Sequence, residues 1–287
     1  SARQSGLWIR AMAALNVTSA GYMIRSTAAA RSLNVTGTVT VADGASLTLN
    51  MASTGPTWAL GSMAFGSGST LNVTGNATAS NSNRIDITTT TSISGGSITL
   101  AGTAAGPTGF VATTPSSTPS VQVTLNTNIT NNSATSATML GANFNNTLTY
   151  GGVLDGSASL QVSGGQAGGA GVVMLAAANS YTGGTYLNHT STGVLRLGIA
   201  NALPVGTTVF FNQSASGGTL SSGGTIDLAG FNQTVAGIVS PTGVRGVANT
   251  GPAATLTLGG GGTYVFDSGI GVPTTTTNLT GANSNIS

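Results

Sequence analysis

Few side chains in the sequence could carry acid–base or metal chemistry. The chain has 287 residues, yet it contains only seven Arg, five Asp and one His, and it has no Lys, Glu or Cys. The acids are widely separated, at Asp43, Asp86, Asp155, Asp227 and Asp267. Catalysis needs ionisable groups that converge on one point. The sequence therefore predicts no catalytic residue unless the fold brings distant aspartates together.

Three of the aspartates have local contexts that explain them without catalysis. Asp43 and Asp155 each precede a glycine, which is typical of a turn. Asp227 stands between Ile226 and Leu228, and alternation along a strand places its side chain on the solvent face. A structural role is therefore the better interpretation of all three.

A coiled β fold could nevertheless stack Asp86, Asp227 and Asp267 into one polysaccharide-cleaving site, since two neighbouring carboxylates hydrolyse glycosidic bonds. Sites of that kind also draw on Lys, Arg or further carboxylates, and the sequence offers few of these. A carbohydrate-active enzyme is therefore the last of three hypotheses, and we expect the protein not to be an enzyme.

We also expect no metal ion and no cofactor. His189 is the only histidine, and between Asn188 and Thr190 it is typical of an exposed turn, whereas zinc needs several His or Cys ligands. The glycine run at residues 259–262 is not followed by Gly-Lys-Ser/Thr, so it is not a phosphate loop.

The arginines are concentrated near the start of the chain, where four of the seven lie within residues 1–31. Two interpretations stay open. The segment is an end cap, which a solenoid needs over its terminal rung, or it is a docking segment in which Trp8, Arg10, Arg25 and Arg31 contact another subunit. A net charge of +2 without a basic cluster among aromatic residues predicts no nucleic-acid partner.

The composition favours short β-strands. Hydrophobic residues make up 39% of the chain and charged residues only 4%, whereas disordered chains have the opposite balance. Apolar residues alternate with Thr or Asn, and the pentapeptide LNVTG at residues 33–37 recurs at residues 71–75. Such alternation is the period of a strand with one buried face. No apolar stretch is long enough for a membrane span.

Self-similar motifs and the lack of tight Asn-Gly hairpins favour a solenoid over an antiparallel sandwich. We predict an all-β fold, a right-handed parallel β-helix (β-solenoid), with rungs of about 20–25 residues. Residues 107–119 contain three prolines and predict a loop that leaves the rod, because proline is excluded from central strands.

Three stretches in the second half follow one pattern of strands and glycine turns: residues 178–185 (ANSYTGGT), 194–198 (VLRLG) and 224–235 (GTIDLAGFNQTV). In order and spacing they resemble the autotransporter-associated β-strand repeat of large secreted bacterial proteins. The resemblance implies a parallel β-helix exported to the cell surface. It implies no reaction, because the repeat is a scaffold for grafted functions.

We expect three parts in the chain. Residues 1–31 are the cap or docking segment, residues 32–150 form a solenoid of less regular rungs, and residues 151–287 form a solenoid with autotransporter-type repeats.

The first functional hypothesis is an extracellular structural protein of a bacterium, a subunit that self-assembles into a filament, matrix fibre or surface layer. End rungs of a solenoid expose unpaired backbone groups, which template end-to-end addition or strand donation. The alternative is the passenger domain of an autotransporter adhesin. We expect a homo-oligomer at the cell surface, with cell-surface glycans as the other class of partner considered.

Overall fold

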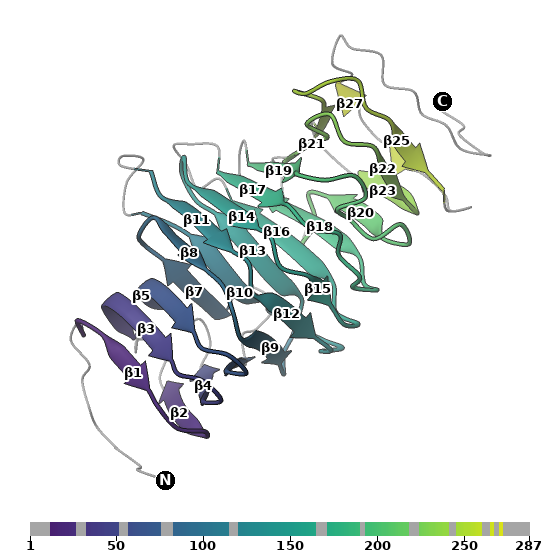
Figure 1. Ribbon diagram of the computed structural model, residues 1–287. Coiled ribbons are helices and arrows are strands. Elements are labelled where there is room, and N and C mark those ends of the chain that lie inside the picture. The colour runs from purple at the N-terminus through teal and green to yellow at the C-terminus, as the bar shows by residue number, and fades with distance from the viewer. Residues whose placement is uncertain are drawn as a thin grey trace.

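The computed structural model is an all-β solenoid, an elongated stack through which the chain advances coil by coil (Figure 1). It describes residues 12–26, 33–51, 57–75, 83–114, 120–164, 171–189, 193–217, 224–240, 245–259, 265–266 and 270–271. Within these residues every strand pair is parallel. The predicted parallel β-helix is confirmed, whereas its right-handed sense stays a prediction.

The strands form three faces of the rod, each built from parallel strands of successive coils. The first face comprises β1 (Leu15–Val17), β3 (Asn34–Val41), β5 (Thr57–Phe65), β7 (Asn83–Ile87), β10 (Thr108–Ala112), β13 (Thr138–Ala142), β16 (Leu160–Gly164), β18 (Thr185–His189), β20 (Thr208–Phe211), β23 (Gly237–Ser240) and β26 (Val265–Phe266). The second face comprises β8 (Thr91–Ile93), β11 (Gln122–Leu125), β14 (Thr147–Tyr150), β17 (Val172–Leu175), β19 (Val194–Leu197), β21 (Thr225–Asp227), β24 (Arg245–Ala248) and β27 (Ile270–Gly271). The third face comprises β2 (Tyr22–Ser26), β4 (Ser46–Met51), β6 (Thr70–Gly75), β9 (Ser97–Gly102), β12 (Asn128–Asn131) and β15 (Leu154–Asp155), followed by the pair β22 (Gln233–Val235) and β25 (Leu256–Leu258).

Coil length varies more than the sequence predicts. On the first face Phe110 pairs with Leu140 and Leu140 pairs with Val162, so one coil takes 30 residues and the next takes 22. The strands stay in register because backbone pairing fixes them. The corners between the faces therefore absorb the extra residues.

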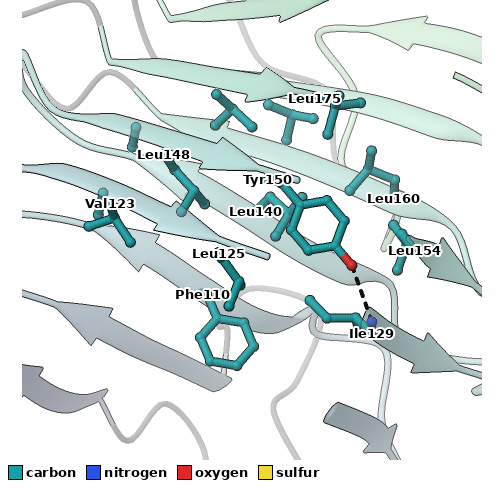
Figure 2. Close-up of a cluster of buried hydrophobic side chains, with 14 of the residues drawn as sticks. Phe110, Val123, Leu125, Ile129, Leu140, Leu148, Tyr150, Leu154, Leu160 and Leu175 are labelled. Atoms are coloured by element: carbon teal, nitrogen blue, oxygen red, sulfur yellow. Dashed lines mark hydrogen bonds between the residues drawn. The ribbon is translucent and has the colours of Figure 1, made fainter. Parts of the chain in front are cut away.

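The core runs through the centre of the rod and follows from alternation along the strands. In β4 and β6 the buried side chains are every second residue, with Thr, Ser or Asn between them. Burying a Leu side chain stabilises the fold by about 2 kcal/mol, and this gain repeats in each coil. Figure 2 shows the middle of the core, where the Tyr150 hydroxyl accepts a hydrogen bond of 3.1 Å from the Ile129 backbone N–H.

The repeated LNVTG pentapeptide does not mark a structural repeat. Leu33 precedes β3 and residues 34–37 form its beginning on the first face, where the register shifts between Val35 and Thr38. Residues 71–75 lie in β6 on the third face, in unbroken register with β4 and β9. At Gly37 the neighbouring coil comes so close that a side chain would collide with the Ala13 carbonyl. The same five residues therefore lie in an irregular strand of one face and in a regular strand of another.

The expectation of a loop at residues 107–119 is wrong for its first half. Residues 108–112 form β10, a central strand of the first face that is buried on both sides. Pro107 immediately precedes the strand, where no ladder N–H is required of it, and its carbonyl accepts a 2.9 Å hydrogen bond from the Asn83 N–H. Residues 115–119, with the other two prolines, lie outside the described residues.

Candidate functional site

The aspartates do not converge on one site. Asp86 lies on the first face, Asp155 on the third and Asp227 on the second. Asp43 occupies a turn before Gly44, as predicted, and its Oδ1 accepts a 2.8 Å hydrogen bond from the Ser67 N–H of the next coil. Asp267 lies outside the described residues. Two carboxylates placed for glycoside hydrolysis are therefore not found in the described part of the chain.

Asp86 forms an ion pair on the outer side of β7. Its carboxylate lies 2.6 Å from Arg84 Nε, and its side chain is 8% exposed. Burial raises the pKa of Asp86, and the charge and hydrogen bond of Arg84 oppose that rise. Because Arg84 and Asp86 are two residues apart on one strand, they point to the same side and neutralise each other.

Asp227 corrects the expectation of a solvent-facing side chain, because it is only 2% exposed. It accepts hydrogen bonds from the Ala229 N–H, the Thr250 N–H, the Thr250 hydroxyl and Arg196 Nε, at 2.7–3.0 Å. Burial raises the pKa of Asp227, but these hydrogen bonds outweigh it and hold the pKa below its usual value. These donors favour the charged carboxylate. Because Arg196 belongs to the preceding coil and Thr250 to the next, Asp227 links three coils.

Two buried amides that the sequence analysis did not single out link neighbouring coils. Asn179 Oδ1 accepts a 2.8 Å hydrogen bond from the Leu154 N–H of the preceding coil, and its Nδ2 donates to the Ala202 carbonyl of the next coil at 2.8 Å. Gln233 accepts from the Leu203 N–H at 3.1 Å and donates to the Leu203 carbonyl at 3.0 Å. Asn179 thus links β15 to the coil of Ala202, and Gln233, at the start of β22, links back to Leu203; among the described residues, those around Asn179 and Leu203 form no strand on the third face.

The other residues of the ANSYTGGT stretch are also structural. Tyr181 is fully buried, and its hydroxyl lies 2.5 Å from Thr185 Oγ1, which lies 3.0 Å from Thr207 Oγ1. Burial is the main cause that raises the pKa of Tyr181. A side chain at Gly183 would meet the backbone of Ser159 at 2.6 Å, so the turn requires glycine there.

Gly184 makes room for an aromatic pair on the outer side of the first face. The Tyr186 and Phe210 rings stack with centroids 4.5 Å apart and an angle of 9° between their planes. A Cβ at Gly184 would lie 2.9 Å from the Phe210 ring and 3.0 Å from the Tyr186 ring. Each ring covers a face of the other, so the pair stabilises the stack of coils.

No cluster of three or more potential metal ligands occurs among the described residues. His189 is the last residue of β18, so it belongs to a strand and not to the predicted turn. In the same part of the chain, no helix has the length and hydropathy required to cross a membrane.

The predicted subunit contact is described only at Arg25. Trp8, Arg10 and Arg31 lie outside the described residues. Arg25 is exposed on β2, the terminal strand of the third face, which pairs on one side with β4. Beside it Tyr22 and Met23 are 50% and 58% exposed. The first described coil thus presents large apolar side chains next to a strand edge.

Comparison with known proteins gives no relative: no family model, curated protein or solved structure matches the chain. The likeness to the autotransporter-associated repeat therefore rests on the quoted residues alone.

Proposed function

We propose that the protein is an extracellular structural subunit that stacks end to end into a filament, matrix fibre or surface layer. The observation that carries this proposal is that the ionisable and amide side chains bind other parts of the scaffold. Asp86 and Asp227 are neutralised by arginines of the scaffold, and Asn179 and Gln233 bond to neighbouring coils. A chain whose polar side chains hold the scaffold together is suited to a mechanical role.

The first described coil supplies the surface for stacking. Among the described residues, β1 is the terminal strand of the first face and β2 is that of the third face. Terminal strands carry backbone N–H and C=O groups that a strand of another chain can pair with. Tyr22 pairs in register with the inward-facing Leu47, yet it is half exposed. A second copy added here would continue the ladders and cover this ring.

The test is negative-stain imaging and sedimentation of the purified protein together with a charged variant. We expect filaments whose mean length falls at least about tenfold in the double variant Tyr22→Lys/Met23→Lys, because charge on a strand edge blocks pairing. Val205→Lys is the matched control, since Val205 is also 53% exposed but lies between β19 and β20.

Each outcome is decisive. Filaments in the control and short rods in the double variant support end-to-end stacking. Isolated rods of the unaltered protein would overturn it and favour the passenger of an adhesin. Equal shortening by all lysine substitutions would place the contact elsewhere.

A further inference from the structure

The outer surface of the third face is an uncharged array of small polar side chains. Strands β4, β6, β9 and β12 pair in unbroken parallel register. Every second residue is buried in the first three strands, so the residues between them face outward. The outward residues of the four strands are Ser46, Thr48, Asn50, Thr70, Asn72, Thr74, Ser97, Thr99, Ala101, Asn128 and Thr130. We call this surface the polar array.

The polar array has a regular two-dimensional spacing. Neighbouring strands lie about 4.8 Å apart, and outward residues on one strand repeat every ~6.7 Å. Among the described strands of the third face, charged outward residues occur only on the two that flank the array, as Arg25 on β2 and Asp155 on β15. Four successive coils therefore present hydroxyl, amide and methyl groups as a net without a charge or an aromatic ring.

Much of the array is free to bind at its surface. The side chains of Thr48, Thr70, Asn72, Thr99 and Thr130 form no hydrogen bond to other described residues. Only the ends are engaged: Ser46 accepts from the Gly21 N–H and Asn128 accepts from the Val153 N–H. The free hydroxyls and amides therefore hydrogen-bond to water, at positions fixed by the strands.

The chemistry of the array selects among partners. A protein or polysaccharide would have to displace this water, and the exchange of hydrogen bonds yields little net free energy. Interfaces overcome that cost with buried aromatic or arginine side chains, which the array lacks. Water itself needs no such displacement, because water molecules held on the array can become part of a crystal.

We infer that the polar array binds ice. The spacing of its rows is of the same size as the repeats of the ice lattice, and water ordered on the array extends that lattice outward. This activity is separate from end-to-end stacking, because it uses the side of the rod and not its terminal strands.

The test measures ice shaping, thermal hysteresis and inhibition of ice recrystallisation by the purified protein. The double variant Asn72→Tyr/Thr99→Tyr places bulky rings at the centre of the array. We expect it to lower the activity at least about tenfold, equivalent to ~1.4 kcal/mol in binding. The control Thr124→Tyr/Thr149→Tyr puts the same rings on the second face, where these residues pair across β11 and β14, and should keep full activity.

Thermal melting of both variants shows whether they are folded, and a folded array variant that loses activity supports the inference. Absence of ice shaping by the unaltered protein overturns it, as does equal loss in both variants. Retention on insoluble cellulose or chitin without any effect on ice would also overturn it, and would assign the array to a neutral polysaccharide.

Discussion

The third face of the rod is built in two ways. From β4 to β15 its coils are joined by parallel strand pairing, with backbone N–H and C=O groups as the partners. In the next two coils, between β15 and β22, the described residues form no strand on this face. There the side-chain amides of Asn179 and Gln233 reach the backbone of the adjacent coil.

Both regions bury the same kind of core, and both satisfy the backbone. Leu71 in the strand-paired region and Leu203 in the amide-bridged region are each 0% exposed. Buried N–H and C=O groups must find partners, but the partner need not be another backbone. An amide carries one donor and one acceptor group, so it mimics a peptide unit. The comparison shows that coils can stack on one another even where they form no strand.

The largest expected effect tests whether the two regions share one core. Leu71→Ala and Leu203→Ala should each lower the free energy of unfolding by about 2–5 kcal/mol, because each leaves a cavity between coils. Urea denaturation followed by circular dichroism measures both. A cost below about 1 kcal/mol for Leu203→Ala alone would show that the amide-bridged coils are loosely packed.

The next effect separates the two kinds of bridge. Asn179→Ala should cost about 2 kcal/mol, because it leaves the buried Leu154 N–H without its acceptor. Hydrogen exchange should show faster exchange at that amide. Asn128→Ala is the control, since Asn128 accepts from the Val153 N–H at an exposed site where water replaces it. Equal effects of the two substitutions would contradict a special role for the buried amide.

The smallest effect is a pH dependence of the second face beside the amide-bridged coils. The pKa of Asp227 is lowered in the folded protein. Its contribution to the free energy of unfolding is therefore complete above the unfolded pKa of about 3.9 and is lost as pH falls through the folded pKa. We expect a small loss of stability on acidification, measured by denaturation at pH 2 to 7. Asp227→Asn should flatten this dependence, and an unchanged profile would mean that Asp227 titrates normally.

The strands were predictable because alternation is a local signal. Leu47 and Leu49 in β4, and Leu71 and Val73 in β6, are all buried with outward Thr or Asn between them. The pairing of strands between coils was not predictable, because the LNVTG pentapeptide occurs on two different faces. The sequence shows the alternation of buried and outward residues in each strand. The face to which a strand belongs depends on the length of the corner before it.

The candidate site was harder to predict because burial at corners is not periodic. Asp227 follows the alternation of β21, yet Thr250 from the next coil covers it. Asn179 lies in a polar, glycine-containing turn, and such a sequence predicts exposed side chains. Gln233 carried a usable signal, since it lies two residues before the buried Val235 and therefore faces inward.

The most direct test of the account is X-ray diffraction from aligned assemblies of the purified protein. End-to-end stacking of coils predicts a strong reflection at about 4.8 Å along the filament axis, because strands lie across the axis at that spacing. Filaments with this spacing perpendicular to their axis, or a failure to form filaments under any condition in which the protein is folded, would contradict it.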